Sequence, residues 1–271
     1  MFSMAIPALH AHRLGRDYGP DSSAQALAGA LAAGVDGLET DVCLTSDGEL
    51  VLLHDPLLSV GTTLDGWAHE RTAAEITQGR LLDRQGEVSG ERPLRLDELL
   101  AGTPSDLPLQ VEVKAHADAE LARRTAAAIC ERYRRRRVRR RIEVISFHSA
   151  ACATAAAYGF RSRVIVFADY APEALAAWAV SRGVRGVSVE HFLLTSRLAS
   201  VFRLAGLSLN TGTVNDAELL LRVNELASPD AVCTDRPAGL RAEALRLEEA
   251  SSTSAILDAE LAPAALSWGA C

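Results

Sequence analysis

Aromatic residues are scarce in this chain of 271 residues, at 5%, while hydrophobic residues of all kinds make up 48%. The core must therefore be built mainly from aliphatic side chains. No apolar run approaches the roughly 20 residues that a membrane-spanning helix needs, so we expect no transmembrane segment. A chain of this length buries enough surface to fold without disulfides or a structural metal.

Cysteine spacing excludes two further classes of protein. The five cysteines are odd in number, lie far apart and never form a CxxC pair. This argues against a disulfide framework and against a zinc knuckle, and reduced thiols are typical of the cytosol. The first residues, MFSMAIPALHAHR, lack the basic start and the long apolar stretch of a secretory signal. We therefore expect a cytoplasmic protein.

An excess of positive charge is also missing, because 28 Lys and Arg face 35 Asp and Glu, which gives a net charge of −7. A nucleic acid would normally meet a basic surface, so nucleic acid is excluded as the main partner. One basic run does stand out, RYRRRRVRRR at Arg132–Arg141. It fits a solvated helix end, and it also fits weak contact with an anionic membrane surface or an acidic partner. The sequence leaves both open.

Short strand-like runs alternate with longer Ala- and Leu-rich stretches along the chain, which predicts βα units and a parallel sheet. The eight predicted strands are Ile6–His12, Gly37–Leu44, Leu109–Lys114, Ile142–Phe147, Arg163–Phe167, Gly186–Val189, Leu207–Asn210 and Ala231–Thr234. The main predicted helices are Ser22–Ala33, Ala119–Tyr133, Ala150–Tyr158, Pro172–Ser181, Ser196–Leu204 and Asp216–Glu225.

Eight βα units in about this length predict an α/β fold, the (β/α)8 TIM barrel. The competing doubly wound sheet would need a glycine-rich loop after its first strand, and this sequence has none. We assign residues 1–247 to the barrel. Residues 248–271 read as an appended C-terminal tail, which we expect to be partly mobile.

One segment breaks the alternation. A further strand is predicted at Glu49–His54, joined to the strand before it by the turn Thr45-Ser46-Asp47-Gly48. The following residues, about 55–95, are polar and weakly periodic. Long connections of this kind in a compact domain are usually functional, so we expect a small insertion over the barrel mouth.

Polar residues interrupt the apolar strands at the end where barrel enzymes carry their function. Glu39 and Asp41 are two residues apart in one strand, so both side chains point to the same face. Glu112 and Lys114 repeat that spacing in LQVEVK. His12 closes the first predicted strand and His54 closes the hairpin strand.

Carboxylates inside strands are costly to bury unless they are paired or bind a metal. Three of them at one barrel level form an all-oxygen set that suits Mg²⁺ or Ca²⁺. Two histidines beside the set can supply an acid and a base, and Arg13 and Lys114 can dock an anionic group. Taken singly, each signal also fits a salt-bridged or hydrogen-bonded structural role; their joint placement favours a site.

The sequence resembles the glycerophosphodiester phosphodiesterase family from Leu9 to about Leu240. The motifs that carry the resemblance are HR at His12-Arg13, GLETDVCLTSDGELVLLHD at Gly37–Asp55, LQVEVK ending at Lys114, SF at Ser146-Phe147 and CTDRP ending at Pro237. The resemblance implies a TIM barrel with a small insertion, Glu39, Asp41 and Glu112 on the divalent cation, His12 and His54 as the acid–base pair, and Arg13 and Lys114 on the phosphate.

The resemblance further implies hydrolysis of a glycerophosphodiester to sn-glycerol 3-phosphate and an alcohol. Two alternatives stay open: a related barrel that acts on another phosphodiester or releases a cyclic phosphate, and a catalytically silent binding barrel. The identity of the alcohol, the choice of cation, the division of labour between the histidines and the oligomeric state also stay open.

The chain departs from the family pattern at two places. A PENT-like segment is replaced by PDSS, which puts Asp21 and Ser22 where the family usually has a glutamate and an asparagine. A tryptophan usual near the late TVN-like turn is absent, and Thr211-Gly212 stands there. We expect an altered or wider pocket for the alcohol, with Trp67 as a candidate replacement. Glu190-His191 is a candidate substrate contact, and Asp55 can orient His54 or cap the hairpin.

Overall fold

A closed barrel of eight parallel strands forms the centre of the molecule. The computed structural model describes residues 6–168 and 170–261, with side chains up to residue 250. The barrel strands are β1 (Ala8–Ala11), β2 (Gly37–Leu44), β4 (Leu109–Val113), β5 (Ile142–Ser146), β6 (Arg161–Val166), β7 (Gly186–Glu190), β8 (Ser208–Gly212) and β9 (Ala231–Thr234). Because β1 pairs in parallel with both β2 and β9, the sheet closes on itself. The predicted TIM barrel is confirmed.

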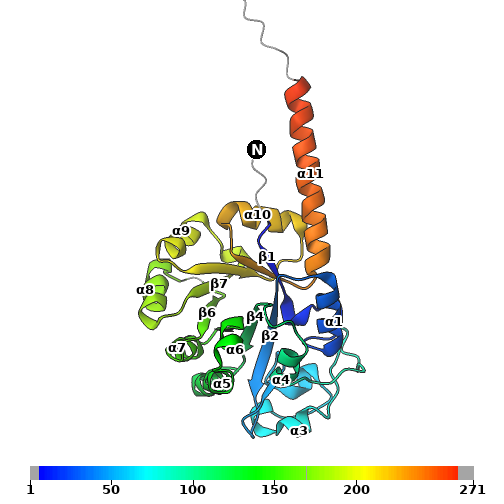
Figure 1. The fold of residues 1–271 in the computed structure, drawn as a ribbon, viewed down its shortest axis with the longest axis vertical. Coiled ribbons are helices and arrows are strands. Elements are labelled where there is room, and N and C mark those ends of the chain that lie inside the picture. Colours follow the sequence, from blue (N-terminus) through cyan, green and yellow to red (C-terminus); the bar gives the residue numbers. More distant parts are fainter. Residues whose placement is uncertain (1–5, 169, 262–271) are drawn as a thin grey trace, which may run out of the picture.

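Helices surround the barrel on its outer side (Figure 1). The longer ones are α1 (Ala24–Ala33), α5 (Ala119–Arg132), α7 (Ser149–Ala157), α8 (Pro172–Arg182), α9 (Ser196–Leu204), α10 (Ala217–Ala227) and α11 (Pro237–Leu261), while α4 (Leu96–Ala101) is shorter. Shorter pieces are α2 (Leu58–Gly61), α3 (Ala73–Ile76), α6 (Arg136–Arg141) and three 3₁₀ turns, at His12–Leu14, Ala68–Glu70 and His191–Leu193.

Local capping explains several helix ends. The Ser23 side chain accepts a hydrogen bond from the Ala26 amide at the start of α1, and Asp216 does the same for Leu219 in α10. Helix α1 therefore begins two residues later than the predicted Ser22, which has a positive φ of 55°. Gly34 follows α1 in the left-handed conformation that glycine adopts without strain.

The main core lies between the outer face of the barrel and the helices, and it is largely aliphatic, as its composition predicts. Leu38, Val111 and Val144 are fully buried on neighbouring strands and belong to the same cluster as Ile129 of α5. A second cluster serves the β6–β8 side and contains Phe202, the largest fully buried side chain. Burying this apolar surface is the principal stabilising contribution.

The amino-terminal half of the barrel interior is filled by a polar plug around Arg163. Its guanidinium donates to Glu143 at 3.2 and 3.3 Å and to the Val187 carbonyl at 3.0 Å. Gln110 donates to the same Glu143 carboxylate at 2.7 Å. Gly186 faces this plug, and a Cβ there would lie 2.7 Å from the Arg163 guanidinium carbon. The glycine therefore makes room for the buried ion pair.

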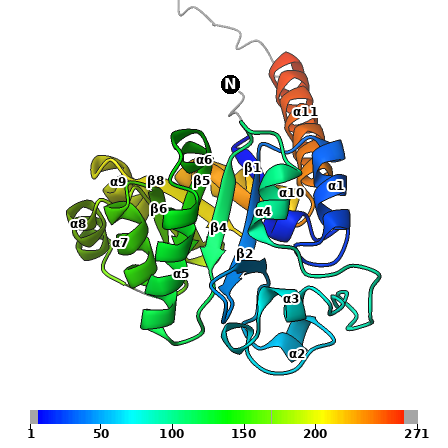
Figure 2. The ribbon, with the colours of Figure 1, turned by 60° about the horizontal axis from the view of Figure 1, so that its bottom comes forward.

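The hairpin and the insertion follow the predicted order with shifted boundaries. Strand β3 (Leu50–Leu52) pairs antiparallel with the end of β2, so it stops two residues before His54 and the predicted strand end is wrong. The segment 55–95 contains two short helices, α2 and α3, that its weak periodicity did not reveal. It has its own small apolar cluster, which includes Leu58 and Ile76. Figure 2 places it beside the carboxyl end of β2.

Helix α11 runs without a break from Pro237 to Leu261 and projects beyond the barrel (Figure 1). The predicted boundary between barrel and tail at 247/248 falls inside this helix, and residues 262–271 of the predicted tail lie outside the described residues. Among the described residues, no helix is both long enough and apolar enough to cross a membrane.

The basic run occupies the end of α5 and the whole of α6, just before β5 begins. It therefore lies at the amino-terminal end of the barrel strands. Arg132 is paired with Asp97 and Glu49, while Arg141 donates to the Leu107 carbonyl at 2.8 Å. Part of the run is thus used in local structure.

Candidate active site

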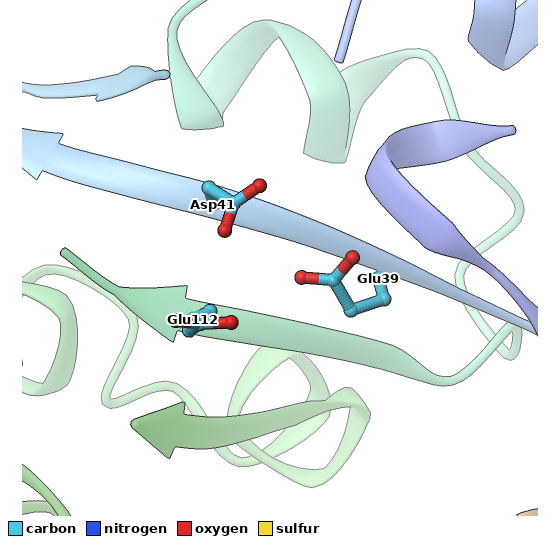
Figure 3. A group of neighbouring side chains, drawn as sticks. All are labelled: Glu39, Asp41 and Glu112. Atoms are coloured by element: carbon cyan, nitrogen blue, oxygen red, sulfur yellow. The ribbon is translucent and has the colours of Figure 1, made fainter. Parts of the chain in front are cut away.

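Three buried carboxylates meet inside the carboxyl-terminal half of the barrel. Glu39 and Asp41 come from β2 and Glu112 from β4, and the parallel register puts Asp41 directly beside Glu112. One oxygen of each residue lies within 4.8 Å of the other two. Figure 3 shows the three side chains turned toward one another from the two strands. The structure thus brings together the three residues that the sequence singled out.

Mutual repulsion and burial set the ionisation of this cluster. Burial, followed by the charges of Asp41 and Glu112, raises the pKa of Glu39 well above its ordinary value. Burial also raises the pKa of Glu112, although Lys114 opposes it. For Asp41, burial acts in the same direction but the surrounding cations, Lys114 first, lower the pKa below the ordinary value. The surroundings therefore favour the ionised form of Asp41 and disfavour that of Glu39.

Lys114 is the nearest cation to the cluster. Its Nζ lies 2.6 Å from Glu112 Oε1 and 3.1 Å from Asp41 Oδ1, and these carboxylates raise its pKa despite burial. One ammonium does not neutralise three ionised carboxylates, and the other nearby cation, the Arg13 guanidinium, is shared between Asp41 and Asp21. Glu39 Oε1 and Asp41 Oδ2 are buried and accept no hydrogen bond within the described residues. An all-oxygen set with this charge and these free acceptors fits a hard divalent cation.

Arg13 reaches the cluster through an unusual backbone conformation. Its φ is 48°, in the left-handed region that non-glycine residues rarely adopt. In this conformation its amide donates a 2.8 Å hydrogen bond to Glu39 Oε2. Its guanidinium pairs with Asp21 and has its Nε 3.7 Å from Asp41 Oδ2. The 3₁₀ turn after β1 therefore points both a backbone donor and a cation at the carboxylates.

His12 is held by a buried carboxylate that the sequence analysis missed. Its Nδ1 lies 2.7 Å from Asp235 Oδ1, just after β9. Asn215 fixes Asp235 from the other side, donating to Oδ2 at 2.8 Å and accepting from the Asp235 amide at 2.8 Å. Burial raises the pKa of Asp235, but the contacts with His12 and Asn215 lower it overall. The aspartate in CTDRP was the available signal, yet its partner is 223 residues away.

His54 has a less enclosed partner. Its Nδ1 lies 3.0 Å from Asp55 Oδ2, and both side chains are partly exposed, at 33% and 38%. The hydrogen bond with His54 is the largest cause of the lowered pKa of Asp55. Asp55 thus contacts the histidine ring, which is one of the two roles that the sequence left open.

A cavity of about 230 Å³ joins these groups, and its two sides differ in character. One side is a charged wall formed by His12, Arg13, Glu39, Asp41, His54, Glu112 and Lys114. The other side includes an apolar wall formed by Ile145, Phe147, Ile165 and Val189. The apolar wall is not evident in the sequence, because its members lie on or directly after three strands whose side chains come together only when the barrel closes.

The residues that depart from the family pattern have defined places. Asp21 binds both Arg13 and Arg16, the latter at 2.6 Å. Ser22 shares a 2.9 Å hydrogen bond with Thr40. Thr211 and Gly212 line the cavity, as does Glu190, whose pKa is raised by burial.

Trp67 does not line the catalytic cavity. It borders a separate hollow with His116, and their ring centroids are 5.2 Å apart. His116 follows β4, whereas Thr211 lies on β8, across the barrel. Trp67 therefore stands away from the position of the absent tryptophan.

The structure resembles solved phosphodiesterases. An Oleispira antarctica phosphodiesterase, solved in complex with the product sn-glycerol-3-phosphate, has a TM-score of 0.75 and 24% identity, with 88% of this chain and 96% of that one covered. A glycerophosphodiester phosphodiesterase from Thermotoga maritima has a TM-score of 0.68 and 22% identity, with 86% and 96% covered. At these identities the likeness shows the shared fold.

Sequence relatives point the same way over shorter stretches. A glycerophosphodiester phosphodiesterase from Caldanaerobacter subterraneus is 34% identical over 108 residues, which are 39% of this chain and 44% of the relative. One from Bacillus altitudinis is 37% identical over 71 residues, 26% of this chain and 29% of the relative. The matched segments thus span less than half the length of these relatives. The model of the glycerophosphoryl diester phosphodiesterase family matches residues 12–239, and the chain belongs to that family.

Proposed function

We propose that this protein hydrolyses a glycerophosphodiester to sn-glycerol 3-phosphate and an alcohol. In this proposal Glu39, Asp41 and Glu112 hold a divalent cation, Mg²⁺ or Ca²⁺, and the substrate is a small molecule. The observation that carries the proposal is the pairing of the carboxylate cluster with two histidines, each held by its own aspartate, in one cavity. A bound cation would neutralise phosphate charge and polarise the P–O bonds.

His12 is suited to be the general base. When Asp235 is ionised, it accepts the proton of His12 Nδ1, which leaves Nε2 free to take a proton from the attacking hydroxyl or water. The Asp235 carboxylate also stabilises the imidazolium that forms. Because Asp235 is buried and fixed by Asn215, the ring keeps its orientation throughout the reaction.

His54 is suited to be the general acid. It stands on the hairpin side of the cavity, separate from His12, and its partly exposed ring can exchange protons with solvent. Protonated at Nε2, it would deliver that proton to the leaving alkoxide. Asp55 at Nδ1 supports the protonated ring, as Asp235 does for His12.

In this proposal Arg13 and Lys114 bind the phosphate. Both line the cavity beside the cluster, and Lys114 Nζ already contacts two carboxylates. A phosphodiester carries one negative charge and the cation two positive charges, so together they would offset part of the negative charge of the carboxylate cluster. The Arg132–Arg141 run lies at the opposite end of the strands, so a membrane bound there would leave the cavity mouth facing away from it.

The experiment is turnover of glycerophosphoethanolamine with added Mg²⁺ or Ca²⁺, followed by phosphorus NMR. A phosphomonoester signal is expected, whereas a lasting cyclic phosphate would favour the cyclising alternative. Either cation should also raise the melting temperature by several degrees, because about 2.7 kcal/mol of stabilisation is gained at a hundredfold excess over Kd. Absence of turnover on every glycerophosphodiester, with no thermal shift, would refute the proposal.

Asp235→Asn provides a sharper test of the histidine roles. The amide can hold the ring in the wrong tautomer, so kcat should fall by about a hundredfold and the acidic limb of the pH–rate profile, which the general base sets, should move. Asp55→Asn is the same change beside His54. It should lower kcat less than Asp235→Asn does, because the His54–Asp55 pair is more exposed than the His12–Asp235 pair. His69→Gln, in the exposed part of the insertion, is the control. An unchanged pH–rate profile in Asp235→Asn would remove His12 from proton transfer.

A further inference from the structure

Exposed phenylalanines gather at one part of the barrel mouth. The described part of the chain has five phenylalanines, of which Phe160 and Phe202 are buried. Phe147, Phe167 and Phe192 are 41%, 63% and 66% exposed. These three follow the carboxyl ends of three consecutive strands, β5, β6 and β7. Large apolar side chains clustered at the rim of a cavity mark a binding surface more often than isolated exposed ones do.

Phe147 and Phe167 form a continuous ridge with the interior of the cavity. Their rings meet edge to face with centroids 5.3 Å apart. Phe147 also lines the cavity with Ile145 and Ile165, and Lys114 Nζ lies 5.8 Å from the centre of its ring. An apolar surface therefore runs from a residue that contacts the carboxylate cluster to the outside of the molecule. We call Phe147 and Phe167 the phenylalanine ridge.

The position of this ridge decides what kind of group it can receive. Phosphate, cation and acid–base groups all require the charged wall, on β1, β2, β4 and the hairpin. A substrate bound there has its phosphate beside Lys114, so the next part of the molecule can pass over Phe147 and out along Phe167. A second apolar surface, the groove between α8 and α9 that includes Val180 and Leu204, shares no lining residue with the cavity. It is therefore separate from the path that the substrate would follow.

We propose that the phenylalanine ridge binds a hydrocarbon chain of the substrate, and that the preferred substrates are glycerophosphodiesters carrying one such chain, as lysophospholipids do. This inference rests on the proposed function. The chain can be attached to the glycerol or to the alcohol, and both arrangements present the same chemistry to the ridge. Phe192, on the next strand end, extends the surface.

The chain takes no part in the reaction. Water supplies the oxygen that bonds to phosphorus, the bond from phosphorus to the alcohol oxygen breaks, and the proton released from water balances the one given to the alkoxide. Burying an apolar chain against aromatic rings adds binding energy remote from the reacting atoms, and that energy appears in kcat/KM.

The experiment compares three substrates with the same glycerophosphoethanolamine core. One has no chain, one carries an acyl chain on the glycerol, and one carries it on the ethanolamine nitrogen. Concentrations stay below the point at which the chain-bearing compounds aggregate. At least one of the two should show a kcat/KM about tenfold or more above that of the chain-free compound. The chain-bearing substrate with the higher kcat/KM shows whether the enzyme prefers the chain on the glycerol or on the alcohol.

Phe167→Ser tests the ridge without touching the cavity lining. This variant should lose most of the kcat/KM advantage of the preferred chain-bearing substrate, and its turnover of the chain-free compound should stay unchanged. Phe167→Leu, which keeps an apolar side chain, should retain much of that kcat/KM advantage. Leu204→Ser is the matched control, since Leu204 is 89% exposed at the far end of α9 from the mouth. It should change neither rate.

Two outcomes would overturn the inference while the proposed function stands: equal kcat/KM for all three substrates, or an advantage that Phe167→Ser and Leu204→Ser affect alike. A chain advantage that appears only above the aggregation concentration would also overturn it, because the ridge would then meet a lipid surface rather than one chain. Absence of turnover on all three substrates would instead count against the proposed function itself.

Discussion

Two charged layers are stacked inside the same barrel, and they differ in how their charge is balanced. The lower layer fills the amino-terminal half of the barrel, and the upper layer is the carboxylate cluster in the carboxyl-terminal half. In the lower layer Arg163 and Glu143 neutralise each other, and Gln110 and the backbone satisfy their remaining hydrogen-bonding groups. In the upper layer Glu39, Asp41 and Glu112 face Lys114 and an Arg13 guanidinium that also pairs with Asp21. The lower layer is complete without a ligand, and the upper layer is not.

The pKa directions express the same difference. Burial raises the pKa of Glu143, but Arg163 and Gln110 lower it overall, so this carboxylate stays ionised in its paired state. Burial and the charges of Asp41 and Glu112 raise the pKa of Glu39, and the Arg13 amide and Lys114 oppose this only in part. The raised pKa of Glu39 shows that the surrounding positive charge does not compensate this carboxylate in full. A buried layer that needs outside charge is therefore a ligand site, while a balanced one is structural.

Glu39→Gln should have the largest effect on this contrast. It removes one ligand of the proposed cation, and kcat/KM should fall on the order of a thousandfold. The metal-free protein should be as stable as the parent or more so, because the change relieves repulsion, and the thermal shift on adding cation should shrink. Differential scanning fluorimetry with and without cation measures both. A large loss of metal-free stability would mean that the upper layer is structural after all.

Arg163→Met should have the opposite pattern. It leaves Glu143 buried without its cation, which should lower the free energy of unfolding by about 3–5 kcal/mol. Turnover per folded molecule should change little, because Arg163 does not line the cavity. Urea unfolding measures the free energy of unfolding, and the rate divided by the concentration of titrated active sites gives the turnover per folded molecule. Adding Glu143→Gln to this variant should recover part of the loss; no recovery would show that packing, not charge, dominates.

The smallest expected effect concerns pH. The pKa of Glu143 is lower in the folded protein than its ordinary value, so its ion pair contributes stability above that ordinary value, about 4.5. The contribution is lost as the pH falls through the folded-state pKa. The difference in unfolding free energy between the parent and Glu143→Gln should therefore be constant from pH 7 to 5 and shrink below pH 4. A difference that grows on acidification would contradict this sign.

Strand periodicity and residue spacing predicted most of the fold. The eight runs of apolar residues correspond to the eight barrel strands, because each strand needs an apolar outer face under the helices. The ends of some strands differ from the predicted ones, because the pairing between strands, rather than the local apolar pattern, decides where a strand stops. His12 follows β1 as part of a 3₁₀ turn, and β3 ends at Leu52 once its pairing with β2 ends. The short helices of the insertion pack on their own small cluster, and their sequence carries little helical periodicity.

The sequence by itself determined the eight-strand order and the placing of Glu39 with Asp41 on one face, because an alternation of period two fixes which side chains share a face. It also supplied His12, His54, Glu112 and Lys114 as strand-end candidates. Only the tertiary structure decided that Asp235 holds His12, that Glu143 neutralises Arg163, and that Phe147 meets Phe167. These contacts join different strands, and strand spacing does not encode which side chains meet until the barrel closes.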